Sequence, residues 1–433
     1  MQELGLARGT VEAGYSMLAA EGYVESNGQA GTFVRRDLKA RALVRADSAT
    51  PPRPTVIPTF RPETTLPLQM GLPALDAFPR KLWARLGAAR IRAMHQEEMA
   101  HPPLGGLPEL RAQIASYLHV ARGIPCSASQ VLVTSGYHAT MGLIAQALLK
   151  TGQQAWIESP SYPPTLASLR SHGLEAVPVP VDTDGLVVSE GILLAPRAHV
   201  AVVTPAHQSP LGVSLSLPRR LALLAWAKRV GSWIVEDDYD GEYRYVGRPL
   251  PALKSLDRDE RVLYAGTFSK LLFPSIRLAY LVVPPSQLKR FESACETTGG
   301  GCPQLTQAIV SDFMAQGHFG RHIQRMRRLY ALRRSSTVAA FRNVLGERVS
   351  IDDQPGGMHL ILRLPSRQSD RSLVARMRAS GLYAEALGDW TEGSRLPPAV
   401  LVSFTNVEDD RAATILAKRI LQLMRQTDRG RMA

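Results

Sequence analysis

Residues 264–280 read YAGTFSKLLFPSIRLAY, and the one lysine in this stretch, Lys270, directs the interpretation of the whole chain. Lys270 follows an apolar run at 261–268 that predicts a β-strand, so its amine is expected at the carboxyl end of that strand. Thr267, Ser269 and Arg277 stand around it. A lone lysine after a strand is usually a solvated charge, but parallel sheets bind ligands at the carboxyl ends of their strands. Lys270 therefore marks a candidate site if other strands end in complementary side chains.

The large central part of the chain alternates short apolar runs with helix-length amphipathic segments. This alternation predicts an α/β fold, with a mixed, mostly parallel sheet covered by helices on both faces. From about residue 320, two long basic helical patterns and the run GGMHLILRL predict a smaller α+β lobe. The predicted strands are 131–134, 154–158, 199–205, 233–237, 261–268 and 278–284, and the clearest helices are 138–150 and 219–230.

The composition is that of a globular protein without membrane segments or metal motifs. The 433 residues are 45% hydrophobic and 21% charged, and no apolar run approaches the ~20 residues of a membrane-spanning helix. The first residues do not form a secretory signal. The three cysteines are an odd number without CxxC spacing, which argues against a disulfide framework and a zinc site. We expect a cytoplasmic protein with no metal centre.

The distribution of positive charge divides the chain. The net charge of +13 would suit a polyanion such as nucleic acid, although an arginine-rich composition alone is weak support for this. The position of the positive charge is more informative. Basic residues between Arg35 and Arg45 precede a segment with six prolines between Pro51 and Pro67. Proline fixes φ and removes a backbone donor, so this segment is expected to be an extended spacer.

Two other predicted strands end in groups that complement Lys270. One runs into Asp237 and Tyr239, and another turns through Ser135 and Gly136 into a helix, presenting backbone N–H groups to an anion. Pyridoxal 5'-phosphate (PLP) requires such a set: an amine for a Schiff base, a carboxylate for a ring cation, a phenol for a ring oxygen, and hydroxyls with an arginine for a phosphate. Each group alone is weak evidence for a cofactor site, since acidic pairs often cap helices and a Ser-Gly pair is often only part of a turn. Their order and spacing carry the prediction.

Four motifs in this order give the chain a family resemblance. GGLPELR, TPAHQSPLG, EDDYD and GTFSKLLFPSIRLAY make it resemble the MocR/GabR-type regulators, in which a GntR-like winged helix is fused to an aminotransferase-like domain of the fold-type I PLP proteins. The resemblance covers about residues 1–425. It implies a homodimer, because the segment with Gly105 and Gly106 lies beside the partner's cofactor in such proteins.

The resemblance gives each candidate site residue a role. The catalytic groups would be Lys270, which bonds covalently to the cofactor, Asp237, which keeps the ring nitrogen protonated, and Tyr239, which bonds the ring oxygen. Tyr162 would stack on the ring. The phosphate would be surrounded by Ser135, Gly136, Tyr137, Thr267, Ser269 and Arg277.

Residues 1–37 resemble the recognition helix and wing of a GntR-type winged helix-turn-helix. Met1 stands within what would be the second helix of that domain, so we expect a partial domain: either the true start lies upstream, or this copy has lost a folded DNA-binding unit. DNA would be a weak partner, contacted by Arg8, Thr10, Arg35 and Arg36. A Pro-rich basic linker would span 38–68, and the aminotransferase-like domain would span 69–433, with a large lobe to about 318 and a small lobe from about 319.

Three positions depart from the pattern of an efficient aminotransferase. Leu401 stands where an arginine would bind a substrate carboxylate, Pro164 where relatives often carry an arginine, and His101 where a tyrosine would reach the partner's phosphate. Without a carboxylate clamp a substrate is poorly oriented, and positioning can be worth ~7 to 11 kcal/mol of barrier. General transamination is therefore expected to be weak or absent.

Two functions remain open on the sequence. The first is a PLP-binding transcriptional regulator whose aminotransferase-like domain senses an amine or amino acid ligand. The alternative is a PLP-dependent aminotransferase with a vestigial N-terminal DNA-binding arm, and an α/β protein without cofactor is a third. The attached recognition helix, wing and spacer favour the regulator.

Overall fold

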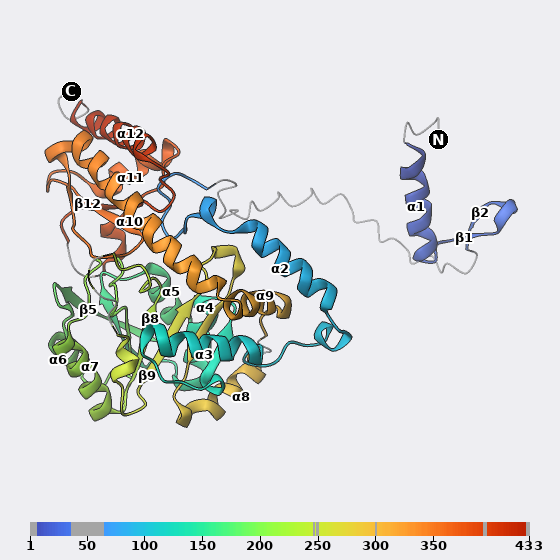
Figure 1. Cartoon of the computed structure of the whole chain (residues 1–433), viewed down its shortest axis with the longest axis horizontal. Coiled ribbons are helices and arrows are strands. Elements are labelled where there is room, and N and C mark those ends of the chain that lie inside the picture. Colours follow the sequence, from blue (N-terminus) through green and yellow to red (C-terminus); the bar gives the residue numbers. More distant parts are fainter. Residues whose placement is uncertain are drawn as a thin grey trace, which may run out of the picture. The chain divides into compact units, whose positions relative to one another are not determined.

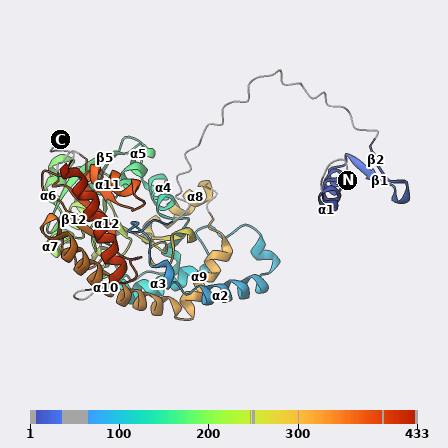
Figure 2. The same cartoon turned by 90° about the horizontal axis from the view of Figure 1, so that it is seen from above.

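The computed structural model describes residues 7–35, 65–245, 247, 251–298, 301–392 and 396–429. The chain divides into two compact units, Met1–Pro62 and Glu63–Ala433. Figure 1 and Figure 2 show the helices and strands with the labels used below. Arg36 and most of the predicted linker at 38–68 lie outside the described residues.

The N-terminal unit is a helix followed by a hairpin. Its elements are α1 (Arg8–Ala20), β1 (Val24–Ser26) and β2 (Thr32–Val34). The two strands pair antiparallel, with Val24 opposite Val34. Among the residues of 7–35 whose burial is described, Val24 alone is buried. The large apolar side chains of α1 are exposed, namely Tyr15, Met17 and Leu18.

The larger unit is built on an eight-stranded sheet with the order β3-β10-β9-β8-β7-β4-β5-β6. The strands from β9 to β5 in this order run parallel, whereas β10 is antiparallel to both β3 and β9, and β6 is antiparallel to β5. This confirms the predicted mixed, mostly parallel sheet. The strands are β3 (Val131–Thr134), β4 (Gln154–Ser159), β5 (Glu175–Asp182), β6 (Gly185–Leu186), β7 (Val200–Val203), β8 (Trp233–Asp238), β9 (Val262–Thr267) and β10 (Ala279–Val282).

Helices cover both faces of this sheet, as predicted. Because strand side chains alternate, Leu263 and Ala265 of β9 pack under α4, α5 and α8, while Val262 and Tyr264 face the opposite layer. That layer consists of α6 and α7 toward one end of the sheet and of α3, α9 and α10 toward the other. The helices are α2 (Arg80–Ala93), α3 (Pro108–Arg122), α4 (Tyr137–Leu148), α5 (Pro163–Ser171), α6 (Val188–Leu194), α7 (Leu217–Val230), α8 (Leu288–Thr298), α9 (Gln304–Ala315) and α10 (His318–Leu345).

The small lobe is an antiparallel four-stranded sheet with the order β11-β12-β14-β13. Its elements are β11 (Ser350–Ile351), β12 (His359–Arg363), α11 (Asp370–Ala379), β13 (Glu385–Ala386), β14 (Ala399–Ser403) and α12 (Asp410–Arg429). The run GGMHLILRL supplies β12, as expected for an α+β lobe. Residues 67–68, which precede α2, are hydrogen-bonded to the small lobe. The N–H groups of Tyr383 and Ser403 donate to the carbonyls of Pro67 and Leu68, both at 2.9 Å.

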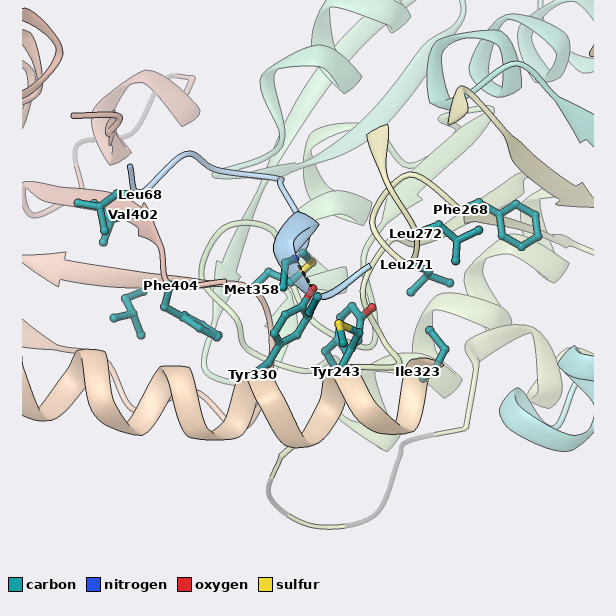
Figure 3. Packing of buried hydrophobic residues seen from close by; sticks show 14 of the residues in the cluster. Leu68, Tyr243, Phe268, Leu271, Leu272, Ile323, Tyr330, Met358, Val402 and Phe404 are labelled. Atoms are coloured by element: carbon teal, nitrogen blue, oxygen red, sulfur yellow. Dashed lines mark hydrogen bonds between the residues drawn. The ribbon is translucent and has the colours of Figure 1, made fainter. Parts of the chain in front are cut away.

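One hydrophobic core joins the small lobe to the loop that follows β9. Figure 3 shows this core from close by, with Ile323 and Tyr330 projecting from α10 into it. The loop contributes Phe268, Leu271 and Leu272, each at most 2% exposed. Burying one such side chain contributes ~1.5 to 3 kcal/mol. The two residues between Phe268 and Leu271 are therefore held by large buried neighbours on both sides.

No helix in the described part of the chain is both long and apolar enough to cross a membrane. Within the same residues, no three or more His, Cys, Asp or Glu side chains are arranged to hold a metal ion. All three cysteines are free.

Candidate functional site

A cavity of about 330 Å³ lies at the carboxyl ends of β8 and β9. The structure brings eight of the predicted cofactor residues to its wall: Tyr137, Tyr162, Asp237, Tyr239, Thr267, Ser269, Lys270 and Arg277. Of the other two, Ser135 is exposed and Gly136 precedes α4, and neither lines the cavity. The remaining wall comes partly from the large lobe and partly from the small lobe and two residues before α2, the latter being Met70, Gly71, Met358, His359, Tyr383, Glu385 and Trp390.

Lys270 directs its amine into this cavity from the loop after β9. Its Nζ donates a hydrogen bond to the carbonyl of Gly71 at 3.0 Å. Burial lowers the pKa of Lys270, and the nearby carboxylates of Asp240, Asp237 and Glu385 oppose that shift. A lowered pKa leaves more of the amine unprotonated, and the unprotonated amine is the form that attacks an aldehyde.

The three consecutive acids at the end of β8 have different surroundings. Glu236 accepts hydrogen bonds from the backbone N–H groups of residues 253 and 254 at 2.7 and 2.8 Å. Asp238 forms a buried ion pair with Arg122. Asp237 lies between them in sequence and, because strand side chains alternate, points to the opposite face, where it lines the cavity. Two of the acids are thus bound within the fold and one is left for the site.

Asp237 faces the cavity without a partner. No described residue donates a hydrogen bond to its carboxylate, although the side chain is only 8% exposed. Burial, with the neighbouring charges of Asp238, Glu158 and Asp240, raises the pKa of Asp237 to about 8. A cation placed in the cavity would reverse this shift and stabilise the carboxylate. The site therefore has the electrostatic character that a protonated ring nitrogen requires.

Tyr239 is held by a histidine that the sequence did not point to. The Tyr239 hydroxyl lies 3.0 Å from Nδ1 of His207, and that nitrogen lies 3.2 Å from the Asp240 carboxylate. Burial, and next the charge of Asp240, raise the pKa of Tyr239 well above its usual value, so the phenol stays protonated and able to donate. Ser209, from the same segment as His207, also lines the cavity.

The beginning of α4 and Arg277 form the end of the cavity suited to an anion. Gly136 has φ 112°, and a Cβ there would lie 3.3 Å from the Arg277 guanidinium, so glycine lets the arginine approach the helix start. Arg277 itself has φ 48°, a left-handed conformation that is uncommon for a residue other than glycine. Backbone strain of this kind concentrates at functional sites. The backbone N–H of Ser269 donates to Thr267 Oγ1 at 3.1 Å and orders the intervening turn.

Tyr162 lies along the side of the cavity between two other aromatic rings. Its ring centroid is 6.1 Å from that of Tyr137 and 5.8 Å from that of Trp390. Tyr137 is fixed by a 2.7 Å hydrogen bond between its hydroxyl and Thr165. Tyr162 remains 37% exposed, so its face is free to stack on a planar group.

These residues fit PLP. The unpartnered Asp237 would bind the ring nitrogen, and Lys270 would bond covalently to the cofactor. Tyr239 would bind the ring oxygen, and the start of α4 with Arg277 would bind the phosphate. When bound, PLP supplies an electron sink for chemistry at an amine. The chain's own groups would then orient that ring, keep its nitrogen charged and cover its face.

The predicted DNA-contacting residues that the structure describes are exposed on the N-terminal unit. Arg8 and Thr10 lie in the first turn of α1, and Arg8 forms a 2.7 Å ion pair with Glu12. The backbone N–H of Arg35 donates to the carbonyl of Tyr23 at 3.1 Å and extends the hairpin by one hydrogen bond. These positions leave the charged groups accessible to a phosphate backbone.

The three positions that depart from an aminotransferase pattern have distinct surroundings. Leu401 is fully buried in an apolar cluster that includes Ile361 and Trp390. Pro164 belongs to the first turn of α5, directly after Tyr162 and Pro163. His101 is exposed. Among the described residues that line the cavity, the one arginine is Arg277, at the anion end.

The fold and this cavity define a PLP-dependent protein of the aminotransferase class. Residues 73–400 match the family model of aminotransferase class I and II. The structure resembles a kynurenine aminotransferase from Pyrococcus horikoshii with a TM-score of 0.75 and 25% identity, over 84% of this chain and 91% of that one.

Similar proteins of known annotation class narrow the family to which the chain belongs. The chain is 38% identical to the probable rhizopine catabolism regulatory protein MocR of Rhizobium meliloti over 88% of its own length and 79% of that protein. It is 31% identical to the HTH-type pyridoxine biosynthesis transcriptional regulator PdxR of Corynebacterium glutamicum over 96% of its own length and 88% of that protein. The chain belongs to the MocR-type transcriptional regulators, in which an HTH segment is joined to an aminotransferase class I and II domain.

Proposed function

We propose that this regulator is a cytoplasmic homodimer whose PLP-loaded aminotransferase-like domain binds a small amine and thereby alters how its N-terminal unit binds DNA. The observation that carries the proposal is the cavity, which is lined by eight of the predicted PLP-binding residues but, among its described lining residues, by no arginine besides Arg277 at the anion end. Such a site suits reversible recognition of an amine better than turnover of amino acids, because no arginine among the described residues lines the far end to orient a carboxylate.

In this proposal three residues act on the cofactor, namely Lys270, Asp237 and Tyr239. The residues that surround the cofactor are Tyr162, Tyr137, Thr267, Ser269, Arg277, Ser135 and Gly136. The domains run as the sequence suggests, with residues 1–37 as the partial winged helix, 38–68 as the linker and 69–433 as the aminotransferase-like domain. The homodimer rests on the family resemblance of the segment with Gly105 and Gly106. Gly106 has φ 100° and a Cβ there would lie 2.5 Å from Val133, so this segment packs tightly against β3. It would lie beside the partner's cofactor.

Gel-shift titrations with DNA from the chain's own promoter region test the proposal. For the wild type, adding PLP and then a panel of small amines should change the apparent Kd for DNA. Lys270→Ala should bind the same DNA without responding to the amines, because the group that bonds to the cofactor is gone. Lys150→Ala, which removes an exposed lysine two residues after the end of α4, is the matched control and should respond like the wild type. Identical DNA binding under all conditions, combined with rapid transamination, would favour the alternative enzyme.

A further inference from the structure

The cavity has two chemically different ends. Arg277 and the start of α4 form one end, and the small lobe forms the other. In the described part of the chain, Lys270 and Arg277 are the only lysine and arginine that line the cavity. The small-lobe end carries a carboxylate, Glu385, together with the aromatic side chains of Tyr162, Tyr383 and Trp390. A ligand that reaches past Lys270 meets these groups.

The Glu385 carboxylate is held in place by two hydrogen bonds. The Tyr383 hydroxyl donates to one carboxylate oxygen at 2.5 Å, and Trp390 Nε1 donates to the other at 2.9 Å. Both partners are neutral donors, so they orient the charge without cancelling it. Arg378 lies nearby, 5.5 Å over the Tyr383 ring, but its Nε donates to the Ala384 carbonyl. Among the described residues, no lysine or arginine forms an ion pair with Glu385.

The neighbouring histidine does not supply a positive charge either. His359 lines the cavity from β12, and its Nε2 lies 2.7 Å from the Pro210 carbonyl. Burial, and next the charge of His207, lower the pKa of His359 to about 4. The ring is therefore neutral near pH 7, and the negative charge of Glu385 dominates this end.

The strand pairing of the small lobe explains why the charge is exposed to the cavity. Glu385 on β13 lies directly opposite Leu401 on β14. Residues paired in this way project from the same face of a sheet. Leu401 packs into an apolar cluster with Trp390, while Met70 from outside the lobe packs against the same cluster. Met70 and Trp390 line this end of the cavity over the buried cluster, with the Glu385 carboxylate beside them, so a second carboxylate on a ligand would be repelled here.

Aromatic rings complete a site for a cation. Tyr162 and Trp390 have ring centroids 5.8 Å apart with their planes inclined at 45°, and Tyr383 is tied to Glu385. Aromatic faces attract ammonium and guanidinium groups, more strongly when the site is shielded from water. A carboxylate beside them adds a charge-assisted hydrogen bond.

We propose that the ligand of this site is a primary amine that carries a second positively charged nitrogen, which Glu385 and the rings of Tyr162, Tyr383 and Trp390 bind. The first amine lies toward Lys270 and the second toward the small lobe. The inference rests on the proposed function, since it assumes a PLP-loaded cavity that binds an amine. At about 330 Å³ the cavity is at the small end of the range for ligand sites, so a ligand that shares it with PLP must be short.

Three probes of equal chain length test the charge preference on the wild-type PLP-loaded protein: 1,4-diaminobutane, butylamine and 4-aminobutanoate. Calorimetric titration should give a Kd for the diamine at least about tenfold lower than for butylamine, and the weakest binding for 4-aminobutanoate. Equal or tighter binding of butylamine or 4-aminobutanoate would overturn the inference. Because this comparison uses only the wild type, it does not depend on how a variant folds.

Glu385→Gln should bring the diamine and butylamine to similar affinities, because the amide keeps the shape but not the charge. Asp389→Asn is the matched control: it removes an exposed acid, paired with Arg371, four positions away and outside the cavity. It should retain the diamine preference, and its loss of that preference would overturn the inference. Absorbance of bound PLP is recorded for every protein. Failure of the wild type to take up PLP would overturn both this inference and the proposed function, whereas normal uptake without a diamine preference would overturn the inference alone.

Discussion

The Lys270 amine lies against the backbone of Gly71, with Nζ 3.0 Å from the Gly71 carbonyl oxygen. A Cβ on Gly71 would lie 2.5 Å from Nζ, and the residue has φ +75°. The segment before α2 therefore forms a wall of the site against the reactive amine, and a side chain at position 71 would push that amine aside. The Thr405 side chain donates to the Leu72 carbonyl at 2.5 Å, which ties this wall to the small lobe.

We expect Gly71→Ala to lose most PLP binding, because the new methyl group displaces the Lys270 amine. Borohydride reduction followed by mass spectrometry measures how much cofactor is bonded to the lysine. Gly231→Ala is the control: it has a similar φ of +81° but no heavy atom within 4 Å of the added Cβ. Both variants carry backbone strain of ~1 to 2 kcal/mol, so only the first should lose cofactor. If Gly71→Ala retained as much cofactor bonded to Lys270 as wild type, the backbone at position 71 would have to move away from the amine.

Lys270→Ala should prevent the covalent bond to PLP while leaving some cofactor bound through the anion end. The wild type with PLP should be yellow and should lose that absorbance on borohydride treatment. The variant should show a spectrum of free aldehyde and no reduced adduct. Wild-type protein that remains colourless after PLP is added would contradict the assignment of Lys270.

The raised pKa of Asp237 predicts a pH dependence of stability in the protein without cofactor. Its pKa is about 8 in the folded state and ~3.9 unfolded, so its proton stabilises the fold fully below the lower value, and this contribution is lost as pH rises through about 8. Asp237→Asn has no such proton. The Tm of the variant should therefore rise relative to wild type as pH increases from ~6 to ~8.

Asp259→Asn, which alters an exposed acid paired with Lys228, should show no pH-dependent difference from wild type. PLP should raise the Tm of wild type more than that of Asp237→Asn, because the carboxylate gains a cationic partner. A constant Tm difference between Asp237→Asn and wild type across this pH range would mean that the folded carboxyl titrates near its usual value.

The site residues that could be predicted from the sequence are those at the ends of strands in the main sheet. Lys270, Asp237 and Tyr239 each follow an apolar run, and strand order brings such positions to one edge. Gly71 and Glu385 carry no such pattern, because they reach the cavity from segments remote in sequence. His207 lay within a recognised motif, yet its contact with Tyr239 depends on the path of the loop.

Two strands of the sheet, β5 and β6, were also absent from the predicted set, and β5 was missed for a physical reason. β5 contains Pro178 and Pro180, which usually exclude a central strand. In the structure β5 pairs along its length with β4, and on its other side only Val181 and Asp182 pair with β6. Over most of its length it is therefore an edge, where proline is tolerated.

We expect alanine, aspartate and glutamate to be poor amino donors to 2-oxoglutarate. Leu401 is fully buried in an apolar cluster, and its cross-strand neighbour Glu385 is negative, so this end of the cavity repels a carboxylate. Formation of the product oxo acids measures the rate. Leu401→Arg should not restore activity, because the new guanidinium would pair with Glu385. Rapid turnover of any of the three donors by wild type would promote the enzyme interpretation.

The last prediction concerns DNA, and it follows from how little of α1 is covered. Base-specific contacts need a rigidly held recognition helix. Within residues 7–35, however, Tyr15, Met17 and Leu18 are 52, 67 and 45% exposed, so the hairpin alone does not fix α1. We therefore expect this 433-residue chain to bind DNA weakly, with little sequence preference and steep salt dependence.

Gel-shift titrations at several salt concentrations would measure these properties. Arg8→Ala and Arg35→Ala should each reduce the slope of log K against log salt by about 0.9, the value for one phosphate contact, and weaken all sequences alike. Glu12→Gln is the opposing control, because it releases Arg8 from its 2.7 Å ion pair and should strengthen binding slightly. Thr10→Ala should change affinity little, since a hydroxyl adds no charge. Tight, sequence-selective binding by the unmodified chain would contradict the prediction, since it requires that the apolar side chains of α1 be covered in solution.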